Sequence, residues 1–167
     1  MVRPARLLAV LFLGLLVGSG AAADDEVEKQ RERLQQTSDV ADRAKVVAKL
    51  GDALLDRMTR AFRKGRTEEG EKLLAEYREV IETAGRKLLA ARLDARRSPH
   101  GFKELEIHIR KGGRRLADIT HSLSYEQAEV VDKTREELES LRQDLLAALM
   151  GVAPDPSRKG PAKEQHQ

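Results

Sequence analysis

The residues of this chain that could do chemistry are its histidines and the acids near them. There are four histidines and no cysteine, and Glu104 and His108 lie four positions apart, so that a helix would place both on one face as metal ligands. One such pair is an incomplete site, because no H-E-x-x-H companion is present, and no serine lies in a G-x-S-x-G context. We therefore predict no catalytic, cofactor-binding or metal-binding residues, and a protein that is not an enzyme. A metal protein or enzyme that uses Glu104 and His108 is the competing hypothesis.

Basic residues are concentrated in the middle of the chain. Positions 86–115 hold ten of them against three acids, a net charge of +7, whereas 124–150 hold seven acids against three basic residues, a net charge of −4. A basic surface of this kind attracts an anionic partner, such as an envelope polymer, a lipid head group or an acidic protein. The alternative is that these basic residues pair internally with the acidic segment. The candidate residues for binding an anionic partner are Arg92, Arg96, Arg97, Lys103, Arg110 and Arg114.

The basic segment surrounds a predicted turn. Pro99 has no backbone N–H and disfavours helical backbone at Ser98, so a helix that arrives from upstream must end there. Gly101 allows positive φ, and Phe102 begins a new apolar stripe. If the helices on either side fold back at Pro99, their basic residues gather around one end of the molecule.

Residues 1–23 have the pattern of a signal peptide, in which two arginines precede an apolar run at 7–18 and small residues follow. We expect cleavage near Ala23 and Asp24, a periplasmic or secreted protein, and no transmembrane segment after cleavage. Loss of the two arginines would reduce the formal charge from +3 to +1. Export separates the protein from the chromosome, and an aromatic content of 3% leaves few rings for base stacking, so we expect no specific nucleic-acid partner.

Apolar residues at helical spacing predict four helices within 38–151, at about 39–64, 67–96, 101–122 and 124–150. Gly51 takes a position in the first apolar stripe where a side chain would be expected, which predicts close backbone approach to a neighbour. Upstream, 24–37 has only two large apolar residues and is predicted to be a charged lead-in, weakly ordered or helical. Downstream, the polar and proline-rich 152–167 is predicted to be a disordered tail.

These helices and their short connections predict an all-α fold. The connection around Gly65 is so short that the first two helices must form an antiparallel hairpin. Two such hairpins predict an up-down four-helix bundle. The alternative is a pair of long helical hairpins that dimerise, so a homodimer is possible.

Leu123-Ser124-Tyr125-Glu126-Gln127 resembles the L-T-x-x-Q signature of helical periplasmic stress-adaptor and metal-resistance proteins of the CpxP and Spy kind. Leu123 and Gln127 match the signature, Ser124 replaces its threonine, and the chain has no second copy. The resemblance implies a chaperone-like or sensor-modulating dimer with a concave basic surface. The segment 39–89 is also similar to helical domains of unknown function in exported bacterial proteins, a similarity that carries no functional residues.

The sequence thus favours an exported, non-enzymatic helical protein that works by binding, as an adaptor of the cell envelope with a basic surface in 86–115. One alternative is a periplasmic chaperone or stress adaptor, as the resemblance implies. Another is a purely structural bundle that associates with itself.

Overall fold

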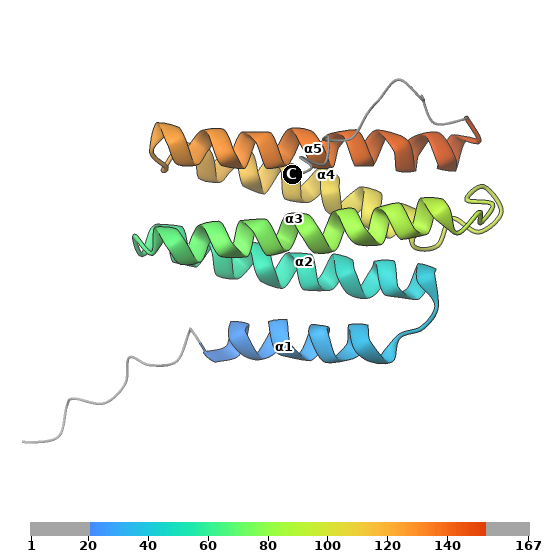
Figure 1. Cartoon of the computed structure of the whole chain (residues 1–167), viewed down its shortest axis with the longest axis horizontal. Coiled ribbons are helices and arrows are strands. Elements are labelled where there is room, and N and C mark those ends of the chain that lie inside the picture. The colour runs from blue at the N-terminus through green and yellow to red at the C-terminus, as the bar shows by residue number, and fades with distance from the viewer. Residues whose placement is uncertain (1–20, 153–167) are drawn as a thin grey trace, which may run out of the picture.

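A computed structural model describes residues 21–152 of the chain, and these residues form five helices without a strand (Figure 1). The all-α prediction is confirmed. The helices are α1 (Ala21–Gln36), α2 (Val40–Arg63), α3 (Thr67–Ala90), α4 (Phe102–Thr120) and α5 (Tyr125–Met150). Within this part of the chain, no helix has the length and the apolar character needed to cross a membrane. Most of the predicted signal peptide, 1–20, and nearly all of the predicted tail, 153–167, lie outside the described residues.

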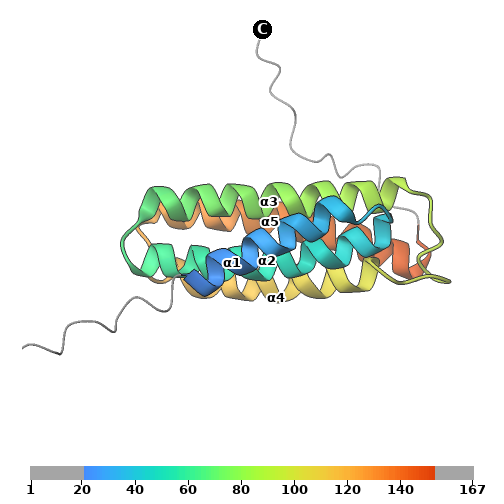
Figure 2. The ribbon, with the colours of Figure 1, turned by 90° about the horizontal axis from the view of Figure 1, so that it is seen from below.

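Helices α2 to α5 lie lengthwise beside one another, and the chain reverses direction at each connection (Figure 1). Helix α2 packs against both α3 and α4, and α5 packs against the same two helices, so these four enclose a common core. The remaining helix, α1, packs on the outside of α2 (Figure 2). The described chain therefore adds a fifth helix to the four that the apolar stripes predict in 38–151.

The helix ends follow the local sequence. Asp39 caps α2 by accepting a hydrogen bond from the backbone N–H of Asp42 at 2.9 Å. Ser124 and Gln127 form a reciprocal capping box at the start of α5. Gly65 takes φ of +69° directly after α2, a left-handed conformation that glycine adopts without strain.

The core is made of aliphatic side chains from all five helices, and Tyr77 and Phe102 are its largest fully buried members. Two glycines make room for polar side chains that enter this core. The His108 imidazole lies over Gly51, where a Cβ would be 2.5 Å from Nε2, and the Tyr77 hydroxyl lies over Gly112, where a Cβ would be 2.4 Å from the oxygen. The close backbone approach expected at Gly51 is therefore wrong, because the space over this glycine is taken by the His108 side chain of α4.

Two elements differ in extent from their expected bounds. Helix α3 ends at Ala90, well before residue 96, because Arg92 turns to φ of +52° and Ala95 then becomes buried against the core. Upstream, the predicted lead-in 24–37 belongs to α1, which begins at Ala21 and buries Val27 completely. Arg31 reinforces this packing through an ion pair with Glu76 of α3.

Candidate functional site

The connection between α3 and α4, residues 91–101, lies at one end of the molecule, on the right in Figure 1. It is fixed at its α4 side, where Gly101 has φ of +82° and lies so close to Ala41 that a Cβ would be 2.8 Å from the Ala41 Cα. His100 lies beside it and contacts the Asp42 carboxylate at 3.0 Å and the Glu104 carboxylate at 3.4 Å. The turn predicted at Pro99 is therefore an ordered loop attached to the start of α2.

The acids around this loop make contacts that hold it in place. The Asp94 carboxylate accepts a hydrogen bond from the Arg96 backbone N–H at 3.1 Å and pairs with the Arg97 guanidinium. The Glu104 carboxylate accepts from the Gly101 backbone N–H at 2.7 Å. The hydrogen bond from His100 lowers the pKa of Asp42 below its ordinary value. These carboxylates thus bind residues of the loop.

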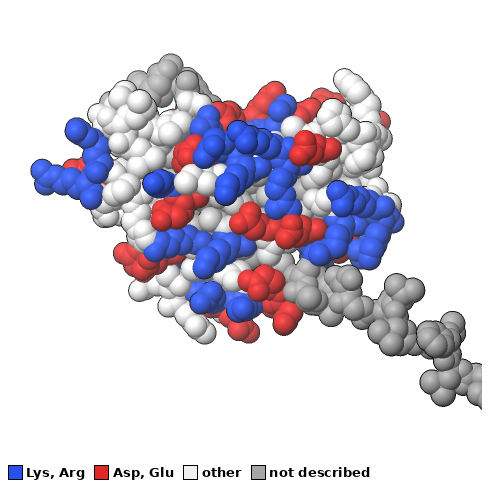
Figure 3. Space-filling model, turned by 180° about the vertical axis from the view of Figure 1, so that it is seen from behind, with Lys and Arg blue, Asp and Glu red and all other residues white. Residues whose placement is uncertain are grey.

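Fewer than half of the basic side chains in 86–115 are paired with an acid. Of the ten basic residues in 86–115, four take part in ion pairs: Arg86, Arg97, Arg110 and Arg115. The other six are exposed and form no ion pair with any residue in 25–152: Lys87, Arg92, Arg96, Lys103, Lys111 and Arg114. We call Lys87, Arg92, Arg96, Arg97 and Lys103, which lie in the loop and the adjoining helix turns, the basic end. Figure 3 shows Lys and Arg side chains projecting from this end of the molecule, at the left of the view.

Internal pairing with the acidic segment is not what the structure shows. No basic residue of 86–115 forms an ion pair with an acid of α5 in the described part of the chain. In the ion pair that joins α4 to α5, the basic residue belongs to α5 and the acid to α4: Arg142 lies 2.9 Å from Glu106. Glu137 and Glu139 of α5 pair with arginines of α3 and of α5 itself.

Exposed apolar side chains accompany the basic end, and sequence reasoning missed them. Leu93 of the loop is 44% exposed, and Met150 and Val152 at the end of α5 are 72% and 59% exposed. The α5 end lies against the loop, because a Cβ on Gly151 would be 2.5 Å from the Arg96 Cδ. This end of the molecule therefore carries both the basic end and exposed apolar side chains, which come from two segments that are far apart in the sequence.

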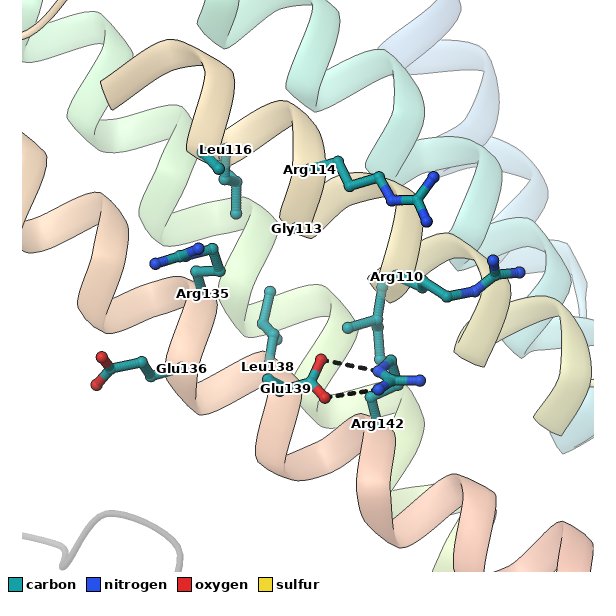
Figure 4. Close-up of a pocket in the computed structure, with 11 residues that line it drawn as sticks. Arg110, Gly113, Arg114, Leu116, Arg135, Glu136, Leu138, Glu139 and Arg142 are labelled. Carbon is teal, nitrogen blue, oxygen red and sulfur yellow. Dashed lines mark hydrogen bonds and ion pairs between the residues drawn. The ribbon is translucent and has the colours of Figure 1, made fainter. Parts of the chain in front are cut away.

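Two of the six predicted candidates, Arg110 and Arg114, lie elsewhere. They line a groove of about 490 Å³ between α4 and α5, together with Arg135 and Arg142 of α5. In Figure 4, Arg110 and Arg114 extend outward from α4, whereas Arg142 is held by the Glu139 carboxylate. The apolar part of the groove includes Ile109, Leu116, Ala117 and Leu138. The sequence did not predict Arg135 and Arg142 as site residues, because they belong to a segment that is acidic as a whole.

The structure separates the pair that could have bound a metal ion. Glu104 faces Gly101 and His100, whereas His108 is buried in the core and its Nδ1 lies 3.3 Å from the Asp52 carboxylate. Burial raises the pKa of Tyr77, whose ring lies 5.7 Å from that of His108. Between residues 21 and 152, His, Asp and Glu side chains form no group of three that could hold a metal ion.

Comparison with known proteins adds no relative, since neither a family model, a curated protein nor a solved structure matches this chain.

Proposed function

We propose that this protein is an exported, non-enzymatic helical adaptor of the cell envelope that binds an anionic partner through its basic end. The observation that carries the proposal is the division of charges at this end. The carboxylates of Asp42, Asp94 and Glu104 contact residues of the loop, while Lys87, Arg92, Arg96 and Lys103 project without an ion pair among the described residues. Such a surface attracts phosphate or carboxylate groups.

The helices provide a rigid support for this end. We propose that α2 to α5 work as an up-down four-helix bundle and that α1 reinforces it. The alternating chain directions and the shared core support this. The alternative is that long hairpins dimerise. Light scattering on the purified chain distinguishes the two by molar mass, because a four-helix bundle needs no second copy to cover its core.

The binding test removes three charges at the basic end and breaks one exposed ion pair, that of Arg97 with Asp94. We choose Arg92→Asn, Arg97→Gln and Lys103→Gln, because asparagine tolerates the positive φ at position 92 and the three side chains are exposed. Arg96 is left unchanged, since its side chain packs against Gly151. The matched control is Arg63→Gln, Lys64→Gln and Arg66→Gln, which removes the same charge at the opposite end and likewise breaks one ion pair, that of Arg66 with Glu69.

Affinity capture of the tagged chain from its own envelope extract, followed by analysis of the bound protein, lipid and polymer, compares these variants. We expect one anionic component to be captured by the wild type and the control, and lost from the basic-end variant when both variants keep the wild-type melting temperature. An unchanged profile in all three samples would refute the proposal. Recovery of the chain alone, as an oligomer, would instead favour the self-associating structural bundle.

Export is tested separately by mass spectrometry of the chain recovered from producing cells. We expect a mature N-terminus at or near Asp24, since the pattern of positive, apolar and small residues in 1–23 is that of a cleaved signal peptide. A chain recovered only in the cytoplasm with residues 1–23 intact would contradict the export part of the proposal.

A further inference from the structure

We propose that the anionic partner of the basic end is a lipid bilayer, and that Leu93, Met150 and Val152 enter its interface while the surrounding arginines and lysines contact lipid phosphates. This inference rests on the proposed function and names the partner of the same site. It follows from the apolar side chains, because binding to a soluble polyanion would not require them.

The shape of this end suits a bilayer. The loop 91–101 projects beyond the ends of α3 and α4 (Figure 1), so the basic end is a convex tip. The groove lies elsewhere, between α4 and α5. A protein partner would need a matching hollow to cover such a tip. A bilayer interface is soft, and it accepts projecting apolar side chains with cationic residues around them.

The tip is also held in one shape before it meets a membrane. Gly101 packs on Ala41, His100 contacts Asp42, and Ala95 is only 3% exposed. The packing of Arg96 against Gly151 brings the loop and the α5 end together, so Leu93 and Met150 lie at the same end of the molecule. Because the loop is already ordered, little conformational freedom is lost when it docks.

Charge and apolar contact supply two separate attractions. A lysine or arginine close to an anionic membrane surface increases binding by about fivefold, so removal of three is expected to weaken it by about a hundredfold. Insertion of apolar side chains adds an attraction that salt does not screen. Neither attraction alone gives stable docking, which predicts that binding falls when either set is removed.

The experiment is flotation of the purified mature chain with vesicles made of equal parts phosphatidylglycerol and phosphatidylcholine, and with vesicles of phosphatidylcholine alone. The variants are the triple neutralisation at the basic end, its control at the opposite end, and Leu93→Ser with Met150→Ser. The last variant keeps every charge. We expect the wild type and the control to float with the anionic vesicles only, and both other variants to stay in solution.

The outcomes separate this inference from the proposed function. If the wild type binds neither kind of vesicle but still captures an envelope component, and this capture requires Arg92, Arg97 and Lys103, the bilayer inference is wrong and the basic end binds another anion. If Leu93→Ser with Met150→Ser floats as well as the wild type, insertion is wrong. If neither vesicles nor any envelope component depends on the basic end, both proposals fail.

Discussion

The imidazole of His108 on α4 lies directly against Gly51 on α2, where a Cβ would come within 2.5 Å of Nε2. We expect Gly51→Ala to destabilise the protein by about 1–3 kcal/mol, because His108 must move out of a packed core. Gly113→Ala is the control. A Cβ there would meet Arg135 Cγ at 3.9 Å, an ordinary contact, so the helix propensity of alanine should stabilise the protein by up to about 1 kcal/mol. Urea unfolding of both variants checks these opposite signs, and a stabilised Gly51→Ala would show that the two helices do not meet in this way.

Arg142 holds α5 against α4 through Glu106, and their side chains are only 17% and 11% exposed. We expect Arg142→Met to lower the free energy of unfolding by about 1–3 kcal/mol, since it leaves the Glu106 carboxylate with poorer compensation in a partly buried place. Arg86 also pairs with a glutamate but is 60% exposed. Arg86→Met should therefore change stability by less than about 0.5 kcal/mol. Equal effects in urea unfolding would contradict this ranking.

Several carboxylates have a pKa below its ordinary value, which makes the fold sensitive to acid. The hydrogen bond with Arg142 lowers the pKa of Glu139 from 4.5, and the hydrogen bond with His108 lowers the pKa of Asp52 from 3.8. The unfolded chain therefore binds protons at a higher pH than the folded chain does, and stability falls as pH decreases below about 4.5.

The Glu139→Gln variant isolates one of these groups. It should be less stable than the wild type at neutral pH, and the difference should shrink as the pH is lowered to about 3, where Glu139 of the wild type becomes protonated in the unfolded chain. Urea midpoints measured along this series check the prediction. A difference that stays constant with pH would show that the Glu139 carboxylate titrates alike in both states.

Helix α1 is held by the buried side chains of Val27 and Gln30 and by polar contacts with its neighbours. Val27 is completely buried, and Arg43 of α2 donates hydrogen bonds to the backbone carbonyls of Leu34 and Thr37 at 2.7 and 2.6 Å. We expect Val27→Asp to release α1, so that hydrogen exchange becomes fast in 25–36 and stays slow in α2 to α5. Glu32→Ala, at an exposed position of the same helix, should leave protection unchanged. Loss of protection throughout the chain would mean that α1 is required by the rest of the fold.

Apolar spacing and caps were sufficient to predict the four helices that follow the lead-in, because each stripe is strong and each connection carries a glycine, a proline or a capping residue. The early end of α3 at Ala90 was not predicted, because no residue type before Pro99 indicates the positive φ of Arg92 or the burial of Ala95. Helix α1 was not predicted with certainty either, because two large apolar residues make only a weak stripe. Its stability depends on packing against α2, where Val27 is buried.

The candidate site was predicted in part. Pro99 indicated the turn around which Arg92, Arg96 and Lys103 gather. Arg110 and Arg114 share the charge of that segment but lie along α4, in a groove completed by residues of α5. Of the apolar residues beside the basic end, Leu93 belongs to the loop itself, whereas Met150 and Val152 come from a distant part of the sequence and are brought beside the loop only by the fold.

The central claim, that the basic end is the binding surface, is tested most directly by cross-linking from defined positions. Because the chain has no cysteine, Ser98→Cys places a single photo-reactive label in the exposed loop, and Glu68→Cys places one at the opposite end of the bundle. Both variants are expressed in producing cells, labelled in intact envelopes and irradiated. We predict adducts with an envelope component from position 98, reduced by raised salt before irradiation, and none from position 68. Equal labelling from the two positions, or labelling from position 68 alone, would contradict the account.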